Sequence, residues 1–203
     1  SSQDQFKESN FYINISNYLN PKFYFNLSLL AENYHLNDNI ELAKKILQIF
    51  KKEDEVYHWF KIKKNTQFLI EIKSEEAALN YFEKNIYSLK NPSNKILFDI
   101  GNIYKKFKKY NKAIEYYSKV LSRIDNNSSI FADILYRRGG AFERMGDYDR
   151  ADIDLLKSLE IRPDDPYSLN YLAYSWLERS HKIDEAIQML EKAYIGKEND
   201  PYI

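Results

Sequence analysis

Small and large apolar residues recur along this chain at a nearly fixed spacing. Five alanines lie 35, 35, 38 and 35 residues apart, at Ala43, Ala78, Ala113, Ala151 and Ala186. Another small residue comes twelve or thirteen positions earlier in each case: Ala31, Thr66, Gly101, Gly139 and Ala173. Large apolar residues flank it, four positions before and three positions after, as Leu135 and Phe142 flank Gly139. The chain is therefore built from a repeated unit.

This pattern predicts two packed helices in every unit. Apolar residues at i and i+7 with a small residue at i+4 line one face of a helix. The small residue lets a second helix approach closely, and the alanine of that helix meets it there. A polar turn joins the two, as at 145–149, where Gly146 suits a helix end and Asp147 a helix start. The expected fold class is all-α.

The order of small residue, aromatic, alanine, aromatic and proline, at about 34 residues per unit, resembles the tetratricopeptide repeat. The clearest unit is 132–165, ADILYRRGGAFERMGDYDRADIDLLKSLEIRPDD. The resemblance implies a right-handed α-solenoid of about five helix pairs, with units at 24–57, 59–92, 94–127, 132–165 and 166–203. Residues 1–23 would be the second helix of a preceding partial repeat. Asn65 and Arg138 depart from the pattern, which prefers leucine at both positions.

Two stretches of the C-terminal half resemble long bacterial tetratricopeptide proteins. They are DILYRRGGAFERMGDYDRA and SLNYLAYSWLERSHKIDEAIQMLEKA. In that group such a pair sits inside a larger array, often behind a secretion signal. The resemblance therefore implies a bacterial protein whose array continues beyond this chain, with the periplasm slightly favoured over the cytoplasm. Residues 200–203, Asp-Pro-Tyr-Ile, stand where a further unit would open.

Composition excludes several classes of protein. The 203 residues are 44% hydrophobic and 30% charged, which is typical of an ordered domain. The absence of cysteine excludes thiolate catalysis and cysteine-ligated zinc. No apolar run reaches the roughly 20 residues that a membrane-spanning helix needs. The formal net charge is zero, so no overall field attracts nucleic acid.

Charge is nevertheless uneven along the chain. Residues 94–127 hold eight Lys or Arg against three Asp or Glu, whereas residues 128–203 hold ten against fifteen. Five lysines cluster at Lys105, Lys106, Lys108, Lys109 and Lys112. Lysines interleaved with aromatic residues can grip a nucleic-acid backbone. We interpret this cluster instead as a solvated turn between two helices.

No arrangement of residues points to catalysis or to a bound metal. The chain has no phosphate-binding loop, dinucleotide fingerprint or nucleophile elbow. His35, His58 and His181 have no helical i, i+3 or i+4 partner, so we expect ordinary surface or turn histidines. The acidic string at Asp147, Asp149, Asp152 and Asp154 lacks the calcium-loop frame and reads as a helix start. We therefore expect no enzyme activity, no cofactor and no metal.

The resemblance implies that the first helices of the units line a concave groove. The groove candidates are Lys63, Gln67, Phe98, Asn102, Tyr136, Arg137, Asn170, Tyr171 and Tyr174. Tyrosine combines apolar area with a polar tip, while Asn and Arg bond a peptide backbone or a carboxylate. We expect a non-catalytic protein–protein interaction scaffold that binds a peptide or helix there.

One subclass of the family uses the same groove to clamp a C-terminal carboxylate. Here only Lys63 and Arg137 match that clamp. Asp99 and Asp133 stand where Asn and Lys are needed, and they would repel a carboxylate. We therefore expect that this particular clamp is absent.

Two alternatives concern other partners. The 35-residue spacing is also that of helical-repeat RNA readers, although zero net charge and the acidic last two units argue against them. The last expected unit places Ala186, Ile187, Leu190 and Ala193 on one face with no following helix to cover it. An exposed apolar stripe favours association, so we expect self-association through an array end.

Overall fold

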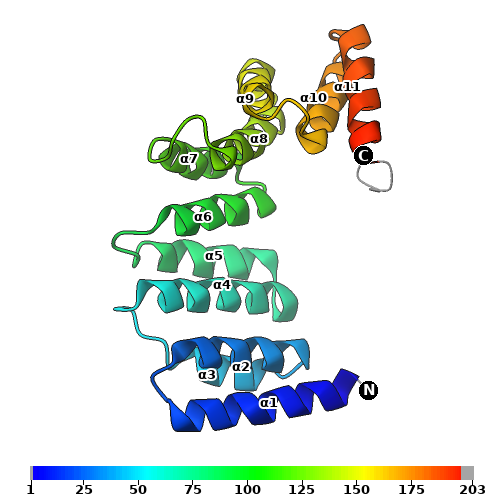
Figure 1. The fold of residues 1–203 in the computed structure, drawn as a ribbon. Coiled ribbons are helices and arrows are strands. Elements are labelled where there is room, and N and C mark those ends of the chain that lie inside the picture. The colour runs from blue at the N-terminus through cyan, green and yellow to red at the C-terminus, as the bar shows by residue number, and fades with distance from the viewer. Residues whose placement is uncertain (1, 198–203) are drawn as a thin grey trace. The chain divides into compact units, whose positions relative to one another are not determined.

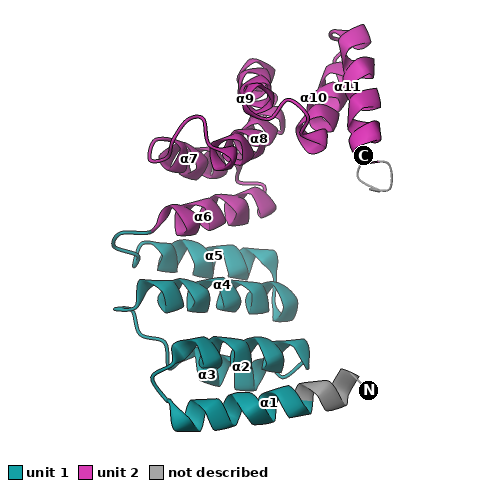
Figure 2. Ribbon diagram, in the orientation of Figure 1, with its two compact units in different colours: residues 1–92 teal, residues 93–203 magenta. Residues whose placement is uncertain are grey.

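The computed structural model describes residues 2–197, and side chains from residue 7 onward. Within residues 2–197 all regular structure is α-helical, which confirms the all-α prediction. The chain forms two compact units, residues 1–92 and 93–203, coloured separately in Figure 2. The bounds of the five expected repeats stay a prediction, and residues 198–203 lie outside the described part.

The first unit holds five helices (Figure 1): α1 (Ser2–Leu19), α2 (Tyr24–Leu36), α3 (Ile40–Leu47), α4 (Glu55–Ile72) and α5 (Glu75–Ile86). Helix α2 pairs with α3 and α4 pairs with α5, while α1 packs on α2. The core around the first pair is apolar, with Leu27, Ala31, Ala43 and Leu47 all buried. Consecutive helices therefore pack as antiparallel neighbours joined by short turns.

The second unit holds six helices: α6 (Asn94–Lys106), α7 (Tyr110–Leu121), α8 (Ser129–Glu143), α9 (Tyr148–Ile161), α10 (Pro166–Glu178) and α11 (Ile183–Gly196). The pairs are α6 with α7, α8 with α9, and α10 with α11. Helix α8 also packs on α7, and α10 packs on α9. Within this unit, α8 thus joins its pair to α6 and α7, and α10 joins its pair to α8 and α9.

The repeated alanines lie at the centre of the helix pairs, as the spacing predicts. Every one of the five is fully buried. A Cβ atom added at Gly139 would lie 2.9 Å from Leu155 Cγ and 3.2 Å from the Ala151 carbonyl oxygen. At Gly101 it would lie 2.7 Å from the ring of Tyr117. The small residue on the first helix is therefore what allows the second helix to pack so closely.

The turn between α8 and α9 follows the sequence expectation. Gly146 has φ +78°, a left-handed conformation that favours glycine. The Asp147 side chain then accepts a hydrogen bond from the backbone N–H of Arg150 and caps α9. The acidic string divides here, because Asp152 and Asp154 do not serve the helix start. Asp152 pairs with Arg179, and Asp154 pairs with Arg138.

The prediction of a surface or turn residue is wrong for His58. This residue is 4% exposed, and its Nε2 lies 2.7 Å from Ser88 Oγ. Because the Ser88 hydroxyl donates to the Asn85 carbonyl, its oxygen accepts the proton of His58 Nε2. Nδ1 of the same ring is buried with no hydrogen-bond partner among the described residues. His58 is therefore a neutral histidine held between α4 and the segment after α5.

The apolar stripe expected on the last helix has different members in the structure. Ala186 and Ala193 are fully buried in the core that α11 shares with α10, and Leu190 packs against that core. The exposed large apolar residues of α11 are Ile183, Ile187, Tyr194 and Ile195.

No helix within residues 2–197 is both long and apolar enough to cross a membrane. Those residues also contain no group of three or more His, Asp or Glu that could hold a metal.

Candidate functional site

The first helices of the second unit bring several groove candidates together. Phe98 on α6 lies under Arg137 of α8, with 5.4 Å between the guanidinium carbon and the ring centroid. Tyr136 of α8 meets Tyr171 of α10 edge to face, with 5.8 Å between ring centroids. Side chains thus connect α6, α8 and α10 in one row. We call this row, with Asn170 and Tyr174 of α10, the first-helix face.

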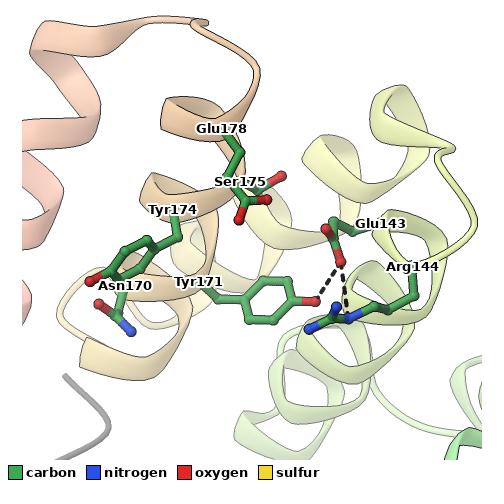
Figure 3. Close-up of a pocket in the computed structure, with 7 residues that line it drawn as sticks. All are labelled: Glu143, Arg144, Asn170, Tyr171, Tyr174, Ser175 and Glu178. Atoms are coloured by element: carbon green, nitrogen blue, oxygen red, sulfur yellow. Dashed lines mark hydrogen bonds and ion pairs between the residues drawn. The ribbon is translucent and has the colours of Figure 1, made fainter.

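A polar pocket of about 230 Å³ lies at one end of this face (Figure 3). Its walls are Glu143, Arg144, Asn170, Tyr171, Tyr174, Ser175 and Glu178. The Tyr171 hydroxyl reaches across from α10 and donates to Glu143 Oε2 at 2.8 Å. Arg144 Nε lies 3.5 Å from the same oxygen. The Glu143 carboxylate is therefore already engaged by two groups of the protein.

The tyrosines of the face differ in how accessible they are. Tyr136 and Tyr171 are half-buried, whereas Tyr174 is 53% exposed. Burial, and then the hydrogen bond to Glu143, raises the pKa of Tyr171. Its hydroxyl therefore remains a neutral donor at physiological pH. Tyr174 is the tyrosine best placed to contact a partner.

Lys105 is a residue of this face that the sequence analysis assigned elsewhere. The sequence places it among the lysines of a solvated turn. The other four are exposed, as expected: Lys106, Lys108, Lys109 and Lys112. The Lys105 ammonium, however, lies 3.3 Å from the point that a Cβ at Gly140 would occupy. The Tyr171 hydroxyl lies at the same distance from that point. Because Gly140 has no side chain, both polar groups can lie close to its backbone.

The surroundings of Lys105 disfavour its charge. Burial lowers the pKa of Lys105, and the positive charges of Arg137 and Arg144 lower it further, while Glu143 opposes them. This combination was not visible in the sequence, because Lys105 lies on α6 whereas Arg137 lies on α8 and Arg144 directly after it. The one available signal was the second glycine of the Gly139–Gly140 pair, which no packing rule of the repeat requires.

An apolar pocket of about 400 Å³ lies towards the N-terminal ends of α6 and α8. It is lined by Asn94, Lys95, Phe98, Val120, Ile124, Ile130, Asp133 and Ile134. Ile130 is 64% exposed at its edge, and Asp133 pairs with Arg162 at 2.8 Å. Apart from Phe98, the apolar residues of this pocket were not among the groove candidates. They come from the α7–α8 connection and its flanks, outside the positions that the family pattern indicates.

The remaining candidates have other surroundings. Asn102 accepts a hydrogen bond of 2.8 Å from the hydroxyl of Tyr117, whose pKa burial raises to about 12. Asn102 thereby satisfies a buried hydroxyl, which is a structural task. Lys63 and Gln67 lie on α4 in the first unit. Lys63 is exposed, and Gln67 accepts from Lys64 Nζ at 3.2 Å and donates to Glu71 at 3.1 Å.

Comparison with known proteins agrees with this architecture. Family models of the tetratricopeptide repeat match residues 95–127 and 132–165. The chain therefore contains tetratricopeptide repeats. Proteins of this family are generally non-catalytic scaffolds for protein interaction, which use the extended surface that their stacked repeats create. No curated protein sequence matches the chain significantly.

Three solved structures illustrate the similarity of fold. BtubC from P. vanneervenii has a TM-score of 0.72 at 17% identity, over 96% of this chain and 89% of that one. MamA has a TM-score of 0.61 at 17% identity, over 83% and 95%. YrrB, described as a tetratricopeptide protein with an unusual peptide-binding site, has a TM-score of 0.61 at 13% identity, over 92% and 93%. At these identities the likeness concerns the fold alone.

Proposed function

We propose that the first-helix face of the second unit binds an extended or helical segment of a partner protein, and that the chain acts as a non-catalytic scaffold. The observation that carries this proposal is the row of contacts from Phe98 through Arg137 to Tyr136 and Tyr171. An apolar pocket lies at one end of α8 and a polar pocket at the other. A segment lying along α8 would meet both.

The two pockets offer different kinds of contact. The apolar one suits a large aliphatic or aromatic side chain, whose burial contributes roughly 1.5–3 kcal/mol. Tyr174 and Arg137 belong to the residue types that most often dominate binding energy at protein interfaces. The peptide-binding site named for YrrB supports the same general use of this fold.

A selection of displayed peptides tests the proposal. Random twelve-residue peptides, displayed as an internal segment so that no carboxyl terminus is free, are selected on the immobilised full chain and on two variants. Tyr174→Ala removes an exposed tyrosine from the first-helix face. Tyr194→Ala is the matched control, because Tyr194 is 54% exposed and lies on α11.

We expect the chain to enrich a set of peptides that Tyr194→Ala retains and that Tyr174→Ala binds about tenfold or more weakly. Enrichment of no peptide, or equal retention by both variants, would contradict the proposal. Binding of RNA that falls steeply with salt and depends on Lys108 and Lys109 would favour the RNA-reading alternative instead.

A further inference from the structure

Two positive side chains and one carboxylate act on the ammonium of Lys105 at the first-helix face. Lys105 lies on α6, Arg137 on α8 and Arg144 directly after α8, and the charge of Glu143, the last residue of α8, opposes their effect on Lys105. Glu143 is occupied, since it accepts from Tyr171 and lies beside Arg144. The local charge on this part of the face is therefore positive, although α8 to α11 are acidic as a whole.

Lys105 has no ion pair or hydrogen bond among the described residues. Its ammonium is packed beside Gly140 and the Tyr171 ring rather than in open solvent. Arg137 likewise has its guanidinium over the Phe98 ring. Among the described residues it forms no ion pair with a carboxylate. A partly buried cation without a direct ion pair lacks most of the compensation that ionised groups in proteins usually have.

The distance between Lys105 and the apolar pocket limits which ligands can contact both. Ile134, in that pocket, and Gly140, beside Lys105, are six residues apart on α8. At 1.5 Å per residue this separation is roughly 9 Å along the helix. An extended chain spans the same distance with about three residues.

From this arrangement, and resting on the function proposed above, we infer that the partner segment is extended and carries an Asp or Glu side chain that pairs with Lys105. This acid lies about three residues from a large apolar side chain that fills the apolar pocket lined by Ile134. A carboxylate suits the place better than a phosphate, because Glu143 beside it would repel a second negative charge more strongly.

The same displayed library tests this inference with two further variants. Lys105→Met removes the charge and keeps most of the side-chain length. Lys106→Met is the matched control, because Lys106 is the next residue of α6 and is exposed. Thermal unfolding of both variants checks that the helices remain folded. One enriched peptide is then synthesised with capped ends, together with a version in which its acidic residue is replaced by the corresponding amide.

We expect peptides enriched by the unmodified chain and by Lys106→Met to carry an acidic residue about three positions from Leu, Ile or Phe. With Lys105→Met the apolar preference persists and the acidic one disappears. Replacing the acid by its amide weakens binding to the unmodified chain about tenfold and leaves binding to Lys105→Met nearly unchanged.

Two results separate failure of this inference from failure of the proposed function. If peptides are enriched through Tyr174 but show no acidic preference, or if that preference survives in Lys105→Met, the inference is wrong and the binding face remains. If no peptide is enriched at all, the proposed function itself fails.

Discussion

Arg138 and Asp154 form a two-bond ion pair between α8 and α9. Arg138 Nε donates to Asp154 Oδ2 at 2.7 Å, and Nη2 donates to Oδ1 at 2.8 Å. The remaining nitrogen, Nη1, donates to Ser118 Oγ of α7 at 2.9 Å. The Asp154 side chain is 5% exposed and that of Arg138 is 22% exposed. At a position where the repeat pattern prefers leucine, this chain thus uses a charged pair that links three helices.

Removing one partner of this pair should destabilise the second unit. Arg138→Leu leaves the Asp154 carboxylate buried without a counter-charge, and we expect it to lower the free energy of unfolding by about 3 kcal/mol. The double variant Arg138→Leu with Asp154→Ala should recover part of the loss, because no uncompensated charge remains. Denaturant unfolding of the unmodified chain and of both variants measures these differences.

The exposed pair of Lys157 with Glu160 on α9 is the control for that series. Lys157→Leu should change the free energy of unfolding by less than about 1 kcal/mol. If Arg138→Leu is no more harmful than Lys157→Leu, the buried pair does not stabilise the unit.

The close packing of α8 against α9 predicts a cost for any larger residue at the repeated alanine. Ala151 is fully buried, and its carbonyl oxygen lies near Gly139. Ala151→Leu should therefore overpack the contact and cost roughly 1–3 kcal/mol. Glu160→Leu adds a leucine on the exposed side of the same helix and should cost less than about 0.5 kcal/mol. Equal thermal midpoints for the two variants would argue against close packing at Ala151.

His58 should make the stability of the first unit depend on pH. Burial lowers its pKa, and the positive charges of Lys52 and Lys61 lower it further. The unfolded chain, with a histidine pKa near 6.5, therefore binds a proton more readily than the folded chain. Stability is full above about pH 6.5 and falls as the pH decreases below it, by at most about 1.4 kcal/mol per pH unit.

Thermal unfolding at pH 7.5 and pH 5.5 measures this effect. We expect the unmodified chain and the control variant His181→Gln, whose residue is exposed, to lose stability at pH 5.5. His58→Gln should show a smaller difference between the two pH values. The same difference in all three proteins would assign the pH dependence to other groups.

Self-association remains a prediction, in which Ile187 of the expected stripe is kept and Ile183 and Tyr194 replace its buried members. Ile183, Ile187 and Tyr194 are spaced by four and seven positions and are exposed on one side of the helix. We expect sedimentation to show association that increases with protein concentration. Ile187→Lys should weaken it about tenfold, since burial of one isoleucine contributes about 1.5–3 kcal/mol. A strict monomer at high concentration would contradict this prediction.

The helix pairs could be predicted because their determinants are local in sequence. Ala151 and Gly139 are twelve residues apart, and one helix pair brings them together. His58 could not be placed in the same way. Its burial depends on Ser88, thirty residues away, whose hydroxyl accepts its proton. The repeat pattern carries no information about that contact.

The candidate site was predictable only in part, for a similar reason. Tyr136, Arg137 and Tyr171 were found because family positions on a first helix face the same way in each unit. Lys105 was missed because charge clustering along the sequence suggested a solvated turn, whereas its side chain extends towards Gly140 of another helix. The apolar pocket lined by Ile130 and Ile134 was missed because it includes residues of a connection between repeats.

Photo-cross-linking of a selected peptide tests the central claim most directly. A benzophenone amino acid replaces Tyr174 on the first-helix face in one preparation and Tyr194 on α11 in another, and each is irradiated with the same peptide. We predict a cross-linked product from position 174 that excess unlabelled peptide suppresses, and none from position 194. Cross-linking from position 194 but not from position 174 would place the partner on another surface and contradict the account.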